Sequence, residues 1–219
     1  MAGAMAFLLA APAHPLPQDR NTQSPNDASF YFPKDTLNQN VVSFFSGDLS
    51  FLGEPSLLAD SRRDATTVSY RLTCKFCQEP NLLVIRILLN ADGDATITTT
   101  TAALHSSGPP TVGDKTQRTV TADQLAQLSR SIEKANFWSM PSTDPEDAKF
   151  YKLHASQWLF EGVRGGAYHV VFREGPKPSA FTEMVRLLAK DLAKLDDSHT
   201  PYAQSVLAPS GARPTPKPH

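Results

Sequence analysis

The chain has 219 residues, of which 40% are hydrophobic and 20% are charged. This length suits one domain with tails, and the apolar fraction excludes a chain that is disordered throughout. The 21 Lys and Arg residues nearly balance the 22 Asp and Glu residues, which gives a formal net charge of −1. Neither a nucleic-acid-binding protein nor a polybasic membrane ligand is therefore expected.

The first 13 residues, MAGAMAFLLAAPA, contain no charge. The run is shorter than the roughly 20 apolar residues that span a bilayer, but it has the length of a signal-peptide hydrophobic region. Ala11-Pro12-Ala13 resembles a small-x-small cleavage site. We therefore predict a signal peptide over 1–13 and a periplasmic or secreted protein. No Lys or Arg precedes the run, which leaves open a cytoplasmic protein with a small-residue tail, or a start upstream of Met1.

The remaining chain divides into a linker at 14–29, a single domain at 30–200 and a Pro-rich tail at 201–219 that is predicted to be disordered. Six aromatic residues lie between 30 and 58, a density that favours an arm packed on the domain. The alternative is an exposed hydrophobic patch for a partner. Asp35 is predicted to cap a short helix that carries Val41, Val42 and Phe45 on one side.

Runs of apolar and β-branched residues predict five strands, and two turn signals join four of them into hairpins. Asp92-Gly93 and Gly165-Gly166 are these turns, since glycine tolerates the positive φ that they need. A Thr-rich run at 95–103 favours a solvated sheet face over an edge that accepts another strand. Residues 105–119 contain Gly and Pro and are predicted to form a loop. The five strands are expected at 66–73, 82–89, 95–101, 157–164 and 167–173.

Two helices are predicted, one after each hairpin. A capping box at Thr121 and Gln124 begins the first, and Ser179 caps the second. Leucines and other apolar residues follow at helical spacing in both. The sequence therefore predicts an α+β fold: an antiparallel sheet of about five strands with two helices on one face, in the order hairpin–helix, hairpin–helix.

The second hairpin carries the motif W-x-x-E-G-x-R-x-G-x-Y-H-V-V-x-R. With this motif, residues 52–195 resemble a family of uncharacterised bacterial proteins. The resemblance implies no activity, cofactor or catalytic residue. Trp158 and Tyr168 are expected to anchor the core between the sheet and the helices. The motif residues are Trp158, Glu161, Gly162, Arg164, Gly166, Tyr168, His169, Val170, Val171 and Arg173.

Cys74 and Cys77 form a C-x-x-C motif. A thioredoxin-like thiol is disfavoured, because no helix is predicted to begin there. A zinc site would need two more ligands, for which His105 and His154 are candidates. In an exported protein we expect a local Cys74–Cys77 disulfide, and in a cytoplasmic protein two free thiols. No metal and no cofactor are predicted.

The register of the second hairpin decides whether its polar residues can act together. A two-residue Gly165-Gly166 loop places Trp158 opposite Arg173 and allows a cation–π contact. A three-residue loop places Glu161 opposite His169, and the carboxylate would then raise the pKa of the imidazole and favour a general base. A structural cross-strand pair is the preferred interpretation.

Two main functional hypotheses follow. The first is a non-enzymatic, exported domain that binds a protein or an envelope component. This hypothesis agrees with the sequence, which contains neither a phosphate-binding loop nor the G-x-S-x-G motif of serine hydrolases. The second is a small-ligand protein or enzyme centred on Glu161, His169 and Arg173. A cleft holding Glu161 and His169 would favour the second, whereas a pair packed beneath the aromatic arm would favour the first.

Overall fold

The structure is a computed structural model, and it describes residues 28–77, 81–90, 93–105, 107–144 and 155–195. The predicted signal peptide, the predicted C-terminal tail, all but the last two residues of the predicted linker, and His154 lie outside these residues. The expectations attached to them therefore stay predictions.

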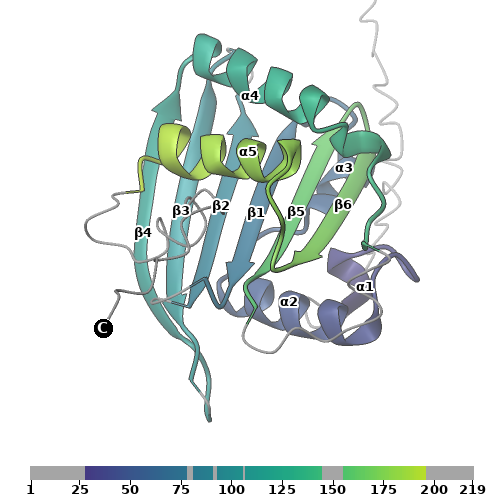
Figure 1. Cartoon of the computed structure of the whole chain (residues 1–219), viewed down its shortest axis with the longest axis vertical. Coiled ribbons are helices and arrows are strands. Elements are labelled where there is room, and N and C mark those ends of the chain that lie inside the picture. The colour runs from purple at the N-terminus through teal and green to yellow at the C-terminus, as the bar shows by residue number, and fades with distance from the viewer. Residues whose placement is uncertain (1–27, 78–80, 91–92, 106, 145–154, 196–219) are drawn as a thin grey trace, which may run out of the picture.

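The fold is α+β, with one antiparallel sheet of six strands in the order β4-β3-β2-β1-β5-β6 (Figure 1). All five neighbouring pairs run antiparallel. The central strand β1 thus lies between the two predicted hairpins. The strands are β1 (Ser69–Lys75), β2 (Leu82–Leu89), β3 (Ala95–Ala103), β4 (Thr111–Val120), β5 (Gln157–Arg164) and β6 (Ala167–Glu174).

Strand β4 corrects the predicted loop over 105–119. Nine of its ten residues are exposed, so it lacks the apolar alternation by which a half-buried strand is recognised. It pairs with β3 along its length, with one irregularity between Thr100 and Ala102. The cross-strand backbone bonds to β3 therefore define this strand, and the burial of its own side chains does not.

The helices cover both faces of the sheet (Figure 1). The two predicted helices lie together on one face, and the Thr121 and Ser179 caps are confirmed. The second of them continues into a π-helical stretch. The helices are α1 (Ala28–Tyr31), α2 (Gln39–Phe51), α3 (Leu57–Arg63), α4 (Ala122–Lys134) and α5 (Ala180–Arg186), with shorter helical segments at Phe137–Ser139 and Leu187–Leu192.

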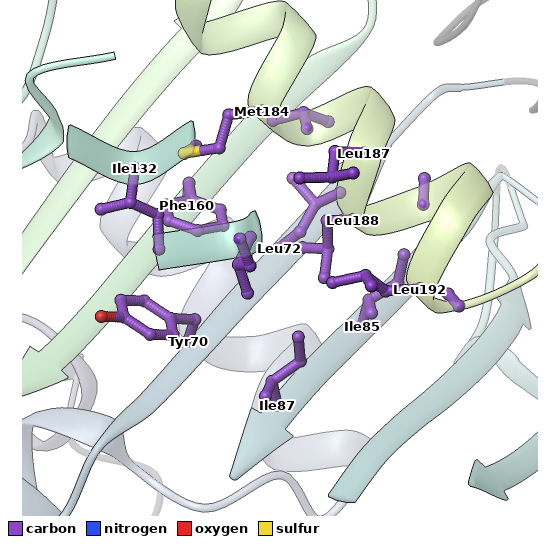
Figure 2. Packing of buried hydrophobic residues seen from close by; sticks show 14 of the residues in the cluster. Tyr70, Leu72, Ile85, Ile87, Ile132, Phe160, Met184, Leu187, Leu188 and Leu192 are labelled. Carbon is purple, nitrogen blue, oxygen red and sulfur yellow. The ribbon is translucent and has the colours of Figure 1, made fainter. Parts of the chain in front are cut away.

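The face under α4 and α5 is an apolar core (Figure 2). Alternate residues of β1, β2 and β5 point into it, as the two-residue period of a strand requires. Leucines of the last helix pack over these strand side chains. The core contains Leu72, Ile85, Ile87, Trp158, Phe160, Phe137, Ile132, Met184, Leu188 and Leu192, all of them buried.

The opposite face is covered by α1 and α2, so the expected placement of helices on one face only is incomplete. The predicted arm packs here through Tyr31, Phe32 and Phe45, which are buried, whereas Phe44 and Phe51 are exposed. Phe45 and Leu49 of α2 are fully buried against Val84 and Leu159 of the sheet. The helix is capped by Asn38, whose side chain accepts the Val41 N–H.

The predicted cap at Asp35 is wrong. Asp35 lies in the turn before α2 and has a φ of 61°, whereas a capping residue has an extended backbone.

The β5–β6 hairpin has the two-residue loop. Arg164 pairs with Ala167 across Gly165 and Gly166, whose φ values are 61° and 75°. Trp158 lies opposite Arg173 as this register requires. The three-residue alternative is therefore excluded.

Candidate functional site

The hairpin register separates the three predicted site residues. Glu161 pairs with Val170, and His169 pairs with Gly162. Because successive side chains in a strand point to opposite faces, Glu161 faces the arm and His169 faces the helices. Arg173 lies on the His169 face, four residues further along β6. No cleft brings Glu161 and His169 together.

Glu161 is completely buried and forms a bidentate ion pair with Arg71 of β1. The Arg71 Nε donates to Glu161 Oε2 at 2.7 Å, and Nη2 donates to Oε1 at 2.9 Å. Arg71 is also fully buried. Burial opposes its charge, but the carboxylates of Glu161 and Glu54 outweigh this effect and hold the pKa of Arg71 above its ordinary value. The arginine therefore stays a cation inside the domain.

The segment between α2 and α3 completes the shell around Arg71. The third guanidinium nitrogen of Arg71, Nη1, donates to the Pro55 carbonyl oxygen at 2.6 Å. The same nitrogen lies 3.9 Å from Glu54 Oε2. The same Glu54 oxygen accepts a hydrogen bond of 3.0 Å from Arg86 Nε of β2. Two carboxylates and two guanidinium groups thus neutralise one another beneath the arm.

Two tyrosines extend this buried network into the arm. Tyr168 donates to Glu161 Oε1 at 2.9 Å, and Tyr31 of α1 donates to the Glu54 carbonyl oxygen at 3.0 Å. Burial, together with the adjacent Glu161 carboxylate, raises the pKa of Tyr168 well above its ordinary value. The phenol therefore keeps its proton. Tyr168 faces the arm, so the expectation that it anchors the core on the helix side is wrong, while Trp158 does lie in that core.

This network holds the arm on the sheet. Complete burial raises the pKa of Glu161, while the Arg71 guanidinium and the Tyr168 hydroxyl act against that rise. Protonation of Glu161 would leave the buried Arg71 cation without its partner charge, so the ion pair persists. A catalytic carboxylate needs access to a substrate, and Glu161 has 0% exposure. The arrangement favours a structural role.

His169 and Arg173 are bound by the chain that precedes β5. The His169 Nε2 contacts the Met140 carbonyl oxygen at 2.9 Å, and its ring packs against Phe137. Burial lowers the pKa of His169, an effect that Arg173 reinforces and the Met140 carbonyl opposes. Arg173 donates to the Phe172 and Pro141 carbonyl oxygens at 2.6 and 3.0 Å. Both side chains therefore tie the chain before β5 to the edge strand β6.

The ring beneath the Arg173 guanidinium is that of Phe181, at 6.0 Å. Arg173 also lines a cavity of about 390 Å³ next to the start of α5. Its Nη1 and Nη2 atoms already donate to backbone oxygens, as described above.

Cys74 and Cys77 are paired in a disulfide at the end of β1, and their Cα atoms lie 6.1 Å apart. Both residues are buried in the apolar core. Phe76, between them, adopts a φ of 57° and exposes half of its surface. Across the described ranges, no three His, Cys, Asp or Glu side chains are grouped as metal ligands would be. His105 lies elsewhere, 2.8 Å from the Thr111 hydroxyl.

Lys75, next to this disulfide, has an unusual environment that the sequence did not predict. Its ammonium group lies 2.6 Å from Asp48 Oδ2, and its side chain is 5% exposed. The rings of Phe44, Phe45 and Phe76 surround the ammonium at 5.1, 5.5 and 5.8 Å, within the range of cation–π contacts. The lysine thus fixes aromatic rings of α2 and of the β1–β2 connection beside one another.

Two of these rings are exposed, and with Phe51 they define what we call the aromatic surface: Phe44, Phe51 and Phe76, with exposures of 61, 43 and 50%. Phe44 and Phe51 are seven residues apart and share one face of α2 with Gly47, which is also exposed. Exposed apolar side chains that cluster in this way are typical of an interaction site.

A pocket of about 430 Å³ opens beside the aromatic surface. Its walls come from the start of α2, the end of β1 and the paired ends of β5 and β6. Apolar rings alternate there with amides and one carboxylate, an arrangement typical of ligand sites. The lining residues are Asn38, Asn40, Val41, Phe44, Lys75, Phe76, Thr143, Gln157, Phe172 and Glu174.

Comparison with the models of known protein families gives no match, and comparison with curated proteins gives none either. Among the helices of the described ranges, none combines the length and apolar character needed to cross a membrane.

Proposed function

We propose that this protein is a non-enzymatic binding domain that captures a protein segment on the aromatic surface. The observation that carries the proposal is the exposure of Phe44 and Phe76 at the mouth of the 430 Å³ pocket. Aromatic side chains beside a pocket are the usual anchors of protein interfaces. The burial of Glu161 beneath the arm supports this hypothesis over the enzymatic one.

The shape of the surface favours a protein segment over a small molecule. Phe44 and Phe51 lie about 10 Å apart along α2, since a helix rises about 1.5 Å per residue. A bound segment could insert one bulky apolar side chain into the pocket and lie along α2 over Gly47. The space above Gly47 is open, because nothing lies within 4 Å of the position a Cβ would take.

The pocket also defines the polar character of the bound segment. Lys75 is neutralised by Asp48, so it offers little attraction to an acidic ligand. The Asn40 side chain, the Asn38 Nδ2 and the Gln157 Oε1 can instead pair with main-chain amides of an extended or helical segment, while the Asn38 Oδ1 accepts the Val41 N–H and the Gln157 Nε2 donates to Glu174. We therefore expect an apolar anchor flanked by uncharged backbone contacts.

The test is selection of peptides from a random display library on the folded full-length chain, followed by calorimetry with each purified peptide. Phe44→Ser and Phe76→Ser are each expected to weaken binding at least about tenfold, because loss of a central anchor costs 1 kcal/mol or more. Both rings are largely exposed, so the variants should unfold at nearly the wild-type temperature.

Val112→Ser is the matched control, since Val112 is an apolar residue of β4 with 51% exposure and lies outside the pocket. It should leave peptide affinity unchanged. Selected peptides that bind Phe44→Ser and Phe76→Ser as tightly as the wild type would contradict the proposal, as would a failure to select any peptide that needs these rings.

We also propose that the protein acts outside the cytoplasm. The Cys74–Cys77 disulfide supports this location, because such bonds persist in oxidising compartments. The test is the intact mass of the native protein after alkylation without reduction. Cleavage after Ala13 with no alkylated cysteine is expected, and an uncut chain with two alkylated cysteines would overturn the proposal.

A further inference from the structure

The edge strand β4 is long and open. It has ten residues, or about 33 Å of extended chain, and nine of them are exposed. In the described part of the chain it pairs with β3 alone (Figure 1). By contrast, the other edge strand, β6, receives Ser142 and Thr143: the Phe172 N–H donates to the Ser142 carbonyl oxygen at 2.7 Å.

The backbone of β4 presents hydrogen-bonding groups at this edge. The Asp114 N–H donates to the Thr101 hydroxyl at 3.0 Å, so the Asp114 backbone faces β3. Backbone direction alternates along an antiparallel strand. The N–H and C=O groups of Lys115, Gln117 and Thr119 therefore point away from β3, toward the free edge.

The charges of β4 match those of an inverted copy of the same strand. An antiparallel pair related by a two-fold axis at Thr116 places Asp114 opposite Arg118 twice, and Lys115 opposite Gln117. No like charges then face one another. Asp114 and Arg118 also occupy the non-hydrogen-bonded positions, where opposing side chains approach most closely.

The other two-fold registers lack this match. Axes at Asp114, Lys115 or Arg118 place a charged residue opposite itself. An axis at Gln117 places Asp114 opposite Val120 and Arg118 opposite Thr116. Opposite charges across a strand pair stabilise it and like charges destabilise it, so the charge pattern selects the Thr116 axis.

We propose that two copies of this chain associate through β4, antiparallel about Thr116, to form one continuous sheet. Lys115 and Gln117 of each copy exchange backbone hydrogen bonds with the other copy, and Asp114 and Arg118 form the two ion pairs. The interaction is isologous and closes after two copies. It leaves the aromatic surface of each copy free, so the dimer would be bivalent for the proposed protein segment.

Sedimentation velocity of the full-length chain at micromolar concentrations tests this proposal. A species of twice the 23.9 kDa chain mass is expected. Asp114→Lys and Arg118→Glu should each raise the dimer dissociation constant at least tenfold, because each creates two like-charged pairs. A wild-type chain that stays monomeric would overturn the proposal.

Mixing the two variants gives the decisive result. An Asp114→Lys chain opposite an Arg118→Glu chain restores two attractive pairs, so the mixture should form a heterodimer although each variant alone is monomeric. The double variant Asp114→Lys/Arg118→Glu should dimerise again. Variants that fail to rescue one another, or that dimerise as well as the wild type, would overturn the register.

Two matched controls distinguish pairing through β4 from a general effect of net charge. Lys115→Glu changes the net charge as Arg118→Glu does, but it faces Gln117, so it should leave the dimer essentially unchanged. Gln117→Pro removes an N–H that points away from β3 and should abolish dimerisation without a loss of secondary structure. A dimer that survives Gln117→Pro, or is lost with Lys115→Glu, would contradict pairing through this edge.

Discussion

The two faces of the sheet are held to their covering helices by different interactions. Under α4 and α5 the contacts are apolar, from Leu72 and Phe160 to Leu188 (Figure 2). Under the arm, apolar residues of α2 share the interface with the buried Arg71–Glu161 pair and Glu54. Apolar packing tolerates substitutions of similar volume, whereas buried charges require every partner in place. The arm is therefore the more specific attachment and the more fragile one.

Removing Arg71 should produce the largest effect. Arg71→Met leaves the Glu161 carboxylate buried without its cation, which is expected to lower the free energy of unfolding by about 3–5 kcal/mol. The measurement is urea unfolding at neutral pH. The double variant Arg71→Met/Glu161→Leu should recover part of this loss. Equal loss in the double variant, or a loss no larger than that of the exposed Arg63→Met, would remove the contrast between the faces.

Truncating Trp158 tests the apolar face. Its ring is 3% exposed and packs against Phe181. Trp158→Ala should lower the free energy of unfolding by about 3–5 kcal/mol, which is close to the loss for Arg71→Met. The two sites should differ in which substitution restores the stability. Trp158→Phe should restore most of it, because the site needs volume rather than charge. A loss below about 1 kcal/mol would show that the helix-side core is not closed over this ring.

Gly162, on the face covered by α4 and α5, should give a smaller loss of stability than Trp158. A Cβ at this position would lie 2.7 Å from the Phe137 ring and 3.1 Å from Tyr70. Gly162→Ala should therefore cost about 1–3 kcal/mol through overpacking. The matched variant is Gly47→Ala on α2, which meets nothing within 4 Å and should stabilise the helix by about 0.5–1 kcal/mol. Thermal unfolding of both variants measures the difference, and losses of similar size would contradict the close approach of Phe137.

His169 should give the smallest effect, seen as a pH dependence. Its folded pKa is lowered from 6.5, so the unfolded chain binds the proton more readily. The stability from His169 is therefore present above about pH 6.5 and is lost as the pH falls through the folded pKa. His169→Gln should flatten this part of the stability profile in chemical unfolding. An unaltered slope in the variant would assign the dependence to another group.

The helix-side half of the fold was predictable because its signals are local. Thr121 and Ser179 cap helices whose apolar stripes follow directly, and Gly165-Gly166 fixes the hairpin register. The strand at 111–120 was not predicted, because almost all of its side chains are exposed and its sequence therefore lacks the alternation of apolar and polar residues.

The candidate site was less predictable, because its residues meet only through the sheet. Glu161 and Arg71 are 90 positions apart in sequence and adjacent in the register of β1 and β5. A single arginine within an apolar strand, such as Arg86 in LLVIRILL, was the available signal that a buried carboxylate lies nearby. Helical spacing placed Phe45 on one side with Val41, but it did not show that Phe44 and Phe76 would both be exposed beside one pocket, because that depends on how α2 and the end of β1 meet.

The neighbouring positions Arg71 and Leu72 have a consequence for how the chain selects its pairing. They point to opposite faces of the central strand, one toward carboxylates and one toward the apolar core. A slip of β1 by one residue would drive the guanidinium into hydrocarbon and the leucine among charges. A sheet in which β1 is slipped by one residue would thus carry an uncompensated charge on each side of its middle strand. We therefore expect the buried ion pair to disfavour this alignment of β1 against both of its neighbours.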